Sequence, residues 1–469
     1  MFIAVVMALS AVVSAIYGEQ EVAVWIAASA AITALFGFVT RRTVPRPQSI
    51  TVKQGFATVG LAWFVFSIFG ALPYLLTGAI PSVTDAVFET ASGFTTTGAT
   101  VLPDPRALPY GILFWRAMTQ WLGGMGVIVL GVAILPLLGT GGMQLARAES
   151  PGPTTDRLTP RFQETAKRLW LVYLVLTLIQ VGLLAFGDMD GFQSVIHSLT
   201  TISSGGFGTE PDSASSFSAY TQWVITAFMF IAGVSFTLHF RAWNKPVSYL
   251  RNAEFKLYAF ITVVAAVIVV GGLLTDFGTT EAIRHGTFNT VSLITTTGFA
   301  SADFATWRPA LQIMIVGLMF LGGMAGSTAG GIKTFRIGVL SKAAFADLRR
   351  LVHPRAVFVT HFGSQKVPDP IIEAVQSFFL FYMFMFMTAT FGLAFIDANL
   401  AEGLDLVTAT SAVASSLGNI GPGLGEVGPA ANYANLPQLA KWLLASLMIV
   451  GRLEIFPVLV LFTRDLWRR

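Results

Sequence analysis

The chain has 469 residues, of which 54% are hydrophobic and only 12% are charged, about half the charged fraction of an ordinary soluble domain. Apolar runs of about 20 residues recur along its length, and each could cross a bilayer core as a helix. The absence of cysteine excludes disulfides, thiolate metal sites and cysteine nucleophiles. The composition predicts an all-α polytopic membrane protein without a separate soluble domain.

The distribution of charge is more informative than the formal net charge of +4. Basic clusters follow every second hydrophobic unit, at 41–53, 147–168, 241–256, 333–366 and 464–469, and acidic residues occupy the alternate connections. The positive-inside rule then predicts a multi-pass protein with both termini in the cytoplasm. We interpret the basic loops as topology signals and expect no nucleic-acid binding.

Residues 1–54 are predicted to form an N-terminal two-helix hairpin and a linker. Its two spans lie at 2–16 and 22–40 and are joined by a short acidic turn. After it, one order recurs four times: a long span, a short helix, a polar glycine-containing stretch and a second long span. We divide this part into four pore repeats at 55–146, 147–245, 246–366 and 367–469.

The long spans of the repeats are expected in pairs, at 56–76 and 110–138, 169–186 and 220–239, 255–274 and 307–340, and 371–395 and 439–462. The short helices between them are expected at 83–92, 192–202, 280–294 and 404–414. With about 10–15 residues they are too short to cross a core about 30 Å thick. The expectation is ten full transmembrane helices plus four re-entrant pore helices around a pseudo-four-fold pore.

A polar stretch follows each short helix: TTTGA from Thr95, SSGGF from Ser203, TTTGF from Thr295 and SLGNIGPG from Ser416. Polar backbone between spans is costly unless it lines water or coordinates an ion. K⁺ sheds its water only where oxygens replace it. Glycine allows a backbone to turn its carbonyls inward, and helix C-termini favour cations.

These stretches predict a four-part K⁺ filter. Its core would be the glycines Gly98, Gly206, Gly298 and Gly421, and its oxygens would come from Thr96, Thr97, Ser204, Gly205, Thr296, Thr297, Asn419 and Ile420. One such stretch is a weak signal, but four copies after four short helices are not explained by packing. An acid follows each glycine by five or six positions: Asp104, Asp212, Asp303 and Glu426. These would concentrate cations at the outer mouth, or they are ordinary loop acids.

Five stretches resemble the Trk/Ktr/HKT superfamily of cation transporters, and most of all its bacterial Trk-type potassium uptake subunits. They are TASGFTTTGATV from Thr90, WLGGMG from Trp121, AESPGP from Ala148, AGSTAGGIK from Ala325 and GRLEI from Gly451. The resemblance implies a pseudo-tetrameric pore, a homodimer in the bacterial cytoplasmic (inner) membrane, and a cytosolic nucleotide-binding regulatory ring as partner. Ser204 stands where relatives often carry an apolar residue, and the fourth stretch lacks a Thr-Thr pair. Selectivity for K⁺ over Na⁺ is therefore an inference from the resemblance.

A glycine-rich run, 322–333, interrupts the second span of the third repeat. Its candidate gate residues are Gly322, Gly323, Gly326, Gly330, Gly331 and Lys333. Such a run holds a helix poorly, and non-helical backbone at this depth must line protein or water. The resemblance implies a gating loop beneath the filter; the alternative is a kink for helix packing. It is not a Walker A loop, because Ile332 separates glycine from lysine and no strand precedes it.

Arg452 lies in the apolar run 442–462. Charges at this depth are costly and usually face a cavity or a partner. We expect Arg452 to face the conduction path and oppose cations; the alternative is an ion pair between helices. Glu454 lies two positions on and would face elsewhere. His197 and His285 are expected to serve packing.

The predicted function is a potassium uptake channel or transporter subunit, not an enzyme, with K⁺ as bound substrate and no cofactor. One alternative is a symporter that couples K⁺ to H⁺ or Na⁺, which would use carboxylates at the membrane midplane. A less favoured alternative is an intramembrane hydrolase using Ser204 or Ser327, which would need a nearby base.

Overall fold

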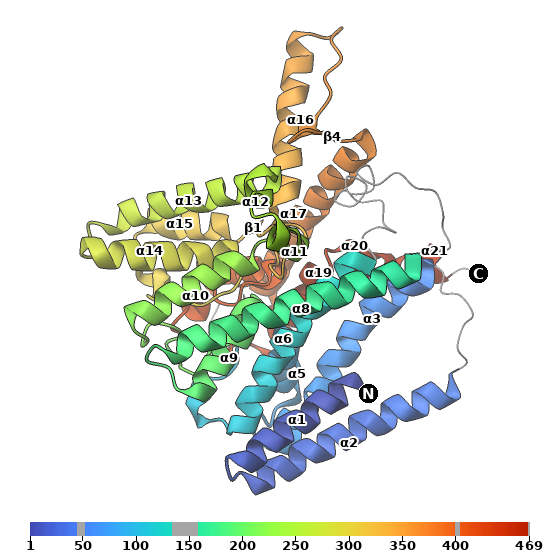
Figure 1. Ribbon diagram of the computed structural model, residues 1–469, viewed down its shortest axis with the longest axis vertical. Coiled ribbons are helices and arrows are strands. Elements are labelled where there is room, and N and C mark those ends of the chain that lie inside the picture. Colours follow the sequence, from blue (N-terminus) through green and yellow to red (C-terminus); the bar gives the residue numbers. More distant parts are fainter. Residues whose placement is uncertain (45–51, 134–157, 399–403, 468–469) are drawn as a thin grey trace.

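The computed structural model describes residues 1–44, 52–133, 158–398 and 404–467. The linker at 45–51, the end of the first repeat's second span at 134–138, the AESPGP stretch and the basic residues at 147–157 lie outside the described residues. The chain is predominantly helical (Figure 1). Helices α1 (Phe2–Ile16) and α2 (Gln20–Thr43) form the expected hairpin, which packs against α6 (Tyr110–Ala133) and α4 (Leu72–Leu76).

The first two repeats follow the predicted order, with additional breaks. The first comprises α3 (Val52–Gly70), α4 (Leu72–Leu76), α5 (Val83–Phe94), η1 (Pro105–Ala107) and α6 (Tyr110–Ala133). The second comprises α8 (Leu158–Ala185), α9 (Gly191–Ile202), α10 (Ala219–Ala232), α11 (Phe236–Asn244) and α12 (Ser248–Arg251).

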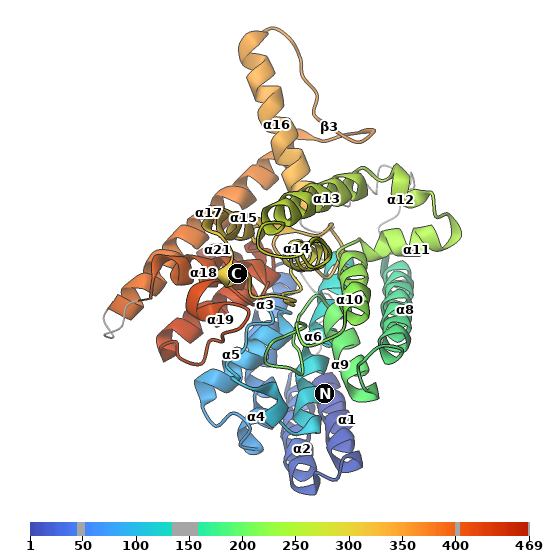
Figure 2. The same cartoon turned by 90° about the vertical axis from the view of Figure 1, so that its left-hand side faces the viewer.

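The third repeat contains the small strands of the described chain. It comprises α13 (Ala253–Leu273), α14 (Thr279–Ile294), η3 (Phe304–Thr306), α15 (Pro309–Leu318), β1 (Leu321–Gly322), β2 (Ile332–Lys333), α16 (Thr334–Val352), β3 (His361–Phe362) and β4 (Gln365–Lys366). Strands β1 and β2 pair in parallel, and β3 and β4 pair antiparallel. Helix α16 extends beyond the rest of the molecule (Figures 1 and 2).

The fourth repeat completes the chain and has the same helix order. It comprises α17 (Asp369–Ala398), α18 (Leu406–Gly418), η4 (Gly425–Val427), α19 (Gln438–Arg452), α20 (Phe456–Leu459), η5 (Val460–Phe462) and α21 (Arg464–Trp467).

Several helices are long and apolar enough to span a membrane, so this is a multi-pass membrane protein. Within the described residues there are five, or up to seven if each of two bent pairs counts as one span. That count of the described helices does not confirm the predicted ten full transmembrane helices. Two predicted continuous spans were wrong: 220–239 is bent by 97° between α10 and α11, and 439–462 by 115° after α19.

The breaks have local causes. At the first, the Phe236 N–H leaves the helical pattern and donates to the Gly326 carbonyl of the run 322–333. At the second, Glu454 and Ile455 have positive φ angles of 57° and 66°, which a continuing right-handed helix does not allow. The span predicted at 307–340 is interrupted between β1 and β2, as the glycine-rich run indicated.

The four short helices α5, α9, α14 and α18 are arranged cyclically. Three of them contact the helix that follows the short helix of the preceding repeat: α9 contacts α6, α14 contacts α10, and α5 contacts α19. The contact of α5 with α19 joins the first repeat to the last. Glycines allow two close approaches, because a Cβ on Gly123 would strike the Phe94 carbonyl and one on Gly451 the Leu417 carbonyl.

Candidate ion-conduction site

Each short helix ends in the same hydrogen-bonded turn. After α5, the Thr97 N–H donates to the Ser92 carbonyl at 2.8 Å and the Thr96 N–H donates to the Gly93 carbonyl at 2.9 Å. The same two bonds recur after α9, α14 and α18. This is the Schellman pattern, which needs a left-handed residue just past the helix. We call the segments 96–98, 204–206, 296–298 and 419–421 the four turns.

The left-handed position is not glycine in any of the four turns. Its occupants are Thr96 (φ 53°), Ser204 (φ 55°), Thr296 (φ 55°) and Asn419 (φ 56°). Glycine would be the least strained choice, and a β-branched residue there costs about 1–2 kcal/mol. Strain of this kind persists where a particular side chain is needed. In the four turns, the common property is a side-chain oxygen.

The third residue of each turn is a glycine with positive φ: Gly98, Gly206, Gly298 and Gly421. A Cβ on Gly98 would strike the carbonyl oxygen of Gly205. In the same way Gly206 abuts the oxygen of Thr297, Gly298 that of Ile420, and Gly421 that of Thr97. The contacts run from the first repeat through the fourth and back to the first. The structure therefore brings all twelve predicted turn residues into one closed ring.

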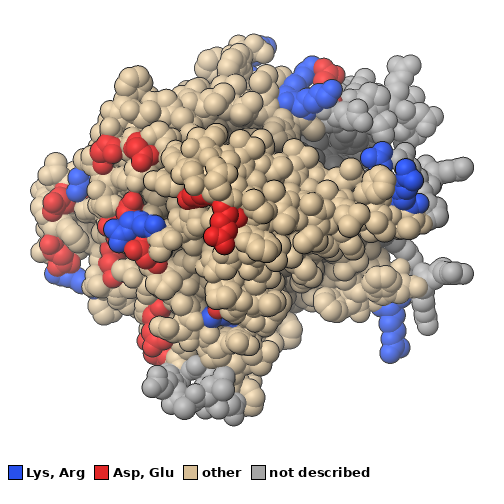
Figure 3. Space-filling model, turned by 90° about the horizontal axis from the view of Figure 1, so that it is seen from below, with Lys and Arg blue, Asp and Glu red and all other residues tan. Residues whose placement is uncertain are grey.

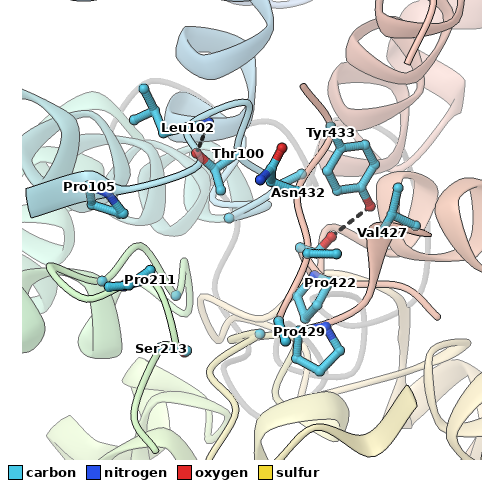
Figure 4. A pocket seen from close by; sticks show the side chains of 18 of the residues that line it. Thr100, Leu102, Pro105, Pro211, Ser213, Pro422, Val427, Pro429, Asn432 and Tyr433 are labelled. Atoms are coloured by element: carbon cyan, nitrogen blue, oxygen red, sulfur yellow. Dashed lines mark hydrogen bonds between the residues drawn. The ribbon is translucent and has the colours of Figure 1, made fainter. Parts of the chain in front are cut away.

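A polar cavity of about 110 Å³ opens onto this ring. All four turn glycines line it, together with the loops that follow the first, second and fourth turns. Figure 4 shows these loops around the cavity, with Thr100 from the first repeat, Ser213 from the second and Tyr433 from the fourth. The Tyr433 hydroxyl donates to the Gly421 carbonyl at 2.8 Å and fixes the fourth turn.

The four acids predicted at the outer mouth do not line this cavity. Asp104 and Asp303 instead cap the short helices η1 and η3 through their carboxylates. Asp212 accepts a hydrogen bond from Ser215 at 2.7 Å, and Glu426 is exposed. Their spacing after the glycines reflects loop capping in two of the four cases.

Glu210 is the acid that the structure places in the cavity lining. Its carboxylate accepts a bond from Gln193 at 3.1 Å and lies 4.0 Å from Arg106. Partial burial raises the pKa of Glu210, Arg106 opposes that shift, and the nearby Asp212 and Asp104 add to it. Sequence reasoning missed Glu210, although it lies four positions after Gly206 in the same loop.

A buried ion pair beneath the outer loops was also missed. Glu89 of α5 and Arg116 of α6 are 0% and 3% exposed, and their charged atoms lie 2.6 Å apart. Glu89 also accepts from the Thr100 hydroxyl and the Val101 N–H, while Arg116 donates to the Gly208 carbonyl. The pair ties the loops after the first two turns to each other.

The run 322–333 lies against the ring from the other side. The Gly330 N–H donates to the Thr296 hydroxyl at 2.6 Å, and the Thr328 hydroxyl lies 2.8 Å from that of Ser204. A Cβ on Gly330 would strike the Gly418 carbonyl. Two of the four left-handed side chains thus hold this loop directly.

The base of the loop is held by a carboxylate that the sequence did not single out. Glu254, at the start of α13, accepts from the Ala325 N–H at 2.7 Å and the Phe335 N–H at 3.2 Å. Within the loop, Lys333 donates to the Ala329 carbonyl. The positive φ angles of Gly326 (77°) and Gly331 (62°) permit its turns, and Gly322 and Gly323 pack too closely for any side chain.

Arg452 ends α19 and reaches the same loop. Its side chain is buried, and Nη1 donates to the Thr328 carbonyl at 2.7 Å. Its Nε and Nη2 have no hydrogen-bond partner among the described residues. Glu454 faces elsewhere, as expected, and pairs with Arg336 of α16. The alternative ion pair between helices therefore belongs to Glu454 rather than Arg452.

The two histidines of the short helices serve packing, as predicted. His197 is buried, bonds Thr209 and stacks on Phe299 at 5.4 Å between ring centroids. His285 bonds the Ser301 hydroxyl at 2.9 Å.

The fold and site define a multi-pass helical membrane protein in which four glycine turns from one chain meet beside a buried loop. The chain belongs to the TrkH family of cation transport proteins, whose family model matches residues 18–249 and 255–468.

Named relatives agree with this family. The Trk system potassium uptake protein TrkH of Halomonas elongata is 44% identical over 429 residues, covering 90% of this chain and 87% of that protein. The protein of the same name from Escherichia coli strain K12 is 42% identical over 426 residues, covering 89% and 86%. The crystal structure of the potassium transporter TrkH from Vibrio parahaemolyticus superposes with a TM-score of 0.90 at 38% identity, covering 99% of this chain and 96% of that one.

Proposed function

We propose that this chain conducts K⁺ across the bacterial cytoplasmic membrane through a filter formed by the four turns. The closed ring of glycine–carbonyl contacts is the observation that carries the proposal, because it gathers backbone oxygens from all four repeats around one point. Rings of carbonyls replace the hydration shell of K⁺ in selective pores. The names of the curated relatives, potassium uptake proteins, agree with this substrate.

The side chains at the left-handed positions supply the inner end of the filter in this proposal. The hydroxyl of Thr96 is buried and has no partner among the described residues, so it is free to coordinate an ion. The C-terminal ends of the four short helices face the same point and add partial negative charge. Strain at Thr96 and Thr296 is then the cost of placing oxygens there.

The loop 322–333 and Arg452 form the gate. The loop contacts Ser204 and Thr296 on the inner side of the ring, and Arg452 adds a buried positive charge that is bonded to the loop itself. Together they oppose the passage of a cation until the loop moves. The glycines Gly322, Gly323, Gly326, Gly330 and Gly331 allow the close packing and turns of the closed loop, and Lys333 fastens its end.

Flux of radioactive Rb⁺ into vesicles containing the purified chain tests the proposal. Downhill flux that follows the membrane potential, with no dependence on H⁺ or Na⁺ gradients, is expected. A Gly298→Ala variant should lose this flux, because its side chain would enter the ring. Obligatory coupling to H⁺ or Na⁺ would overturn conduction in favour of a symporter.

The positions of the membrane-embedded acids favour conduction over the symporter. Glu89 is paired with Arg116 and Glu454 with Arg336, whereas a coupling site needs carboxylates free to exchange ions. The serines of the hydrolase alternative bond Thr328 and the Met324 carbonyl, and neither partner is a base.

The surface charge supports an orientation with the loop side facing the cytoplasm. In Figure 3 the acidic side chains gather mainly toward one end of the molecule, and separate basic groups mark the other. Arg41, Arg42 and Arg464 lie at helix ends near the termini. Excess positive charge marks the cytoplasmic side, so both termini are assigned to the cytoplasm.

Helix α16 supports the proposed homodimer. Its exposed side chains include Phe345, Leu348, Leu351 and Val352, an apolar surface that projects from the body (Figure 2). The chain has no cysteine, so a Leu348→Cys variant carries a single thiol, and oxidation should cross-link two copies in membranes. A monomeric product would argue against this interface. The proposed cytosolic partner is the nucleotide-binding regulatory ring that the sequence resemblance implies. The term "Trk system" in the relatives' names agrees with a system of several components.

A further inference from the structure

The four turns are not stabilised in the same way. In the first turn the hydroxyls of Thr95 and Thr97 lie 2.7 Å apart, and in the third those of Thr295 and Thr297 lie 2.8 Å apart. These hydrogen bonds attach the middle residue of each turn to the end of its own short helix. In the second turn the middle residue is Gly205, which has no side chain to make this bond.

A side chain from the first repeat occupies the space where a side chain of residue 205 would lie. Gln120 of α6 is fully buried, and its Nε2 donates to the Gly205 carbonyl at 2.6 Å. Its Oε1 accepts from the Phe207 N–H at 3.1 Å. The two partners fix the orientation of the carboxamide, and its two bonds lie on either side of Gly206.

Steric contacts show that the Gln120 carboxamide and a side chain at 205 exclude each other. A Cβ built on Gly205 would strike the carboxamide carbon, oxygen and nitrogen of Gln120. Ser203, which corresponds to Thr95 and Thr295, donates to the Thr200 carbonyl at 3.1 Å. An intrahelical anchor in the second turn is thus replaced by an anchor from the neighbouring repeat.

We propose that Gln120 is a positioning residue that sets the second turn of the filter and thereby contributes to selectivity for K⁺ over Na⁺. Two consecutive glycines, Gly205 and Gly206, have more backbone freedom than the other turns. The Gly205 oxygen is the one that abuts Gly98 in the ring, so the anchor acts on the ring dimension. Whether selectivity follows cavity size or the field of the carbonyls, it depends on that position. This inference rests on the proposed function.

The test is a Gln120→Met variant of the full chain in vesicles, with uptake of Rb⁺ and Na⁺ measured side by side. Methionine keeps the length of the side chain and removes both hydrogen bonds. The Rb⁺/Na⁺ uptake ratio is expected to fall about tenfold, the scale of one or two lost buried hydrogen bonds. Gln222→Met is the matched control, because Gln222 is buried in α10 but donates to the Ala214 and Phe217 carbonyls outside the ring.

A double variant, Gln120→Ala with Gly205→Thr, separates positioning from general damage. Removing the carboxamide makes room for the threonine, whose hydroxyl can bond Ser203 as in the first and third turns. The uptake ratio of the double variant should recover toward that of the wild type, whereas Gly205→Thr alone should lose uptake through the clash. If Gln120→Met does not fold, recovery in a folded double variant still supports the inference, and failure to recover overturns it.

An unchanged uptake ratio in folded Gln120→Met would also overturn the inference while leaving the proposed function intact, provided that the wild type conducts Rb⁺. A wild type without Rb⁺ uptake would instead refute the proposed function. An equal fall in ratio in Gln222→Met would show that any buried glutamine affects selectivity, and would overturn the specific role of Gln120.

Discussion

Neutralising Arg452 is predicted to increase K⁺ flux strongly. Its guanidinium is 3% exposed, is bonded to the Thr328 carbonyl at 2.7 Å, and has two nitrogens without partners among the described residues. Glu454, the nearest acid in sequence, pairs with Arg336 instead. Glu454 nevertheless attracts Arg452 electrostatically, so it neutralises part of the charge, and we expect the remainder to oppose a cation in the ion path.

The magnitude follows from Coulomb's law. If the guanidinium and a passing cation are taken to be about 8 Å apart, at an effective dielectric of about 20, the two unit charges repel by about 2 kcal/mol. That energy corresponds to a roughly 30-fold change in rate. Arg452→Gln removes the charge and retains a donor for Thr328, so Rb⁺ flux into vesicles should rise by about this factor.

Arg452→Lys separates charge from contact. It keeps the positive charge but loses the planar, multi-donor geometry of arginine, so its flux should stay close to that of the wild type. If Arg452→Lys raised flux as much as Arg452→Gln, the bond to the loop rather than the charge would be the barrier. If neither variant changed flux, the assignment of Arg452 to the gate would be refuted.

Three further predictions concern the ring, the loop and the outer cavity. Gly206→Ala should reduce Rb⁺ flux by more than tenfold, because its φ of 74° disfavours alanine and the added carbon would strike the Thr297 oxygen; normal flux would show that the ring does not conduct. Glu254→Ala removes the two hydrogen bonds that hold the loop and should raise basal flux about tenfold or more, since a hydrogen bond contributes a net of about 0.5–1.5 kcal/mol. An unchanged flux in folded protein would remove Glu254 from the gate. Glu210 should make flux depend on external pH. Because its pKa is raised, Glu210 takes up a proton, and loses its attraction for cations, at a higher pH than an ordinary glutamate. Flux should therefore fall as the external medium is acidified through that range. A Glu210→Gln variant should lack this dependence, and persistence of the dependence would assign it to another group.

The positions of the four turns were predictable from sequence because the signal is local. A short apolar helix followed by a polar glycine stretch is readable in each repeat, and all twelve residues from Thr96 to Gly421 lie in one ring. Their order around the ring depends on contacts between distant repeats, such as Gly421 with Thr97, and no local pattern contains that information.

The breaks in the spans were not predictable, because hydropathy does not change where a helix bends. The run through Val234 is apolar on both sides, yet the chain turns by 97° to bond the loop of the third repeat. In the same way the positive φ at Ile455 has no compositional signal. A β-branched residue is disfavoured there. The turn is held by the bonds from the Glu454 and Ile455 N–H groups to the Gly451 and Val450 carbonyls and by the ion pair of Glu454 with Arg336.

The outer acids show the limit of reasoning from spacing. Asp104 and Asp303 follow their glycines at similar distances because both cap the start of a short 3₁₀ helix, where a side-chain oxygen satisfies a free N–H. The acid that does line the cavity, Glu210, belongs to no such series. Side-chain direction in a loop is set by its partners, here Gln193 and Arg106.

The cyclic contacts of the ring have a mechanical consequence. Each turn glycine lies against a carbonyl oxygen of another repeat. No single turn can therefore move inward without displacing its neighbour. The diameter is therefore a collective property of four unequal sequences. A substitution in one turn therefore changes the positions of all four turns. The repeats are free to diverge in sequence as long as each keeps its glycine.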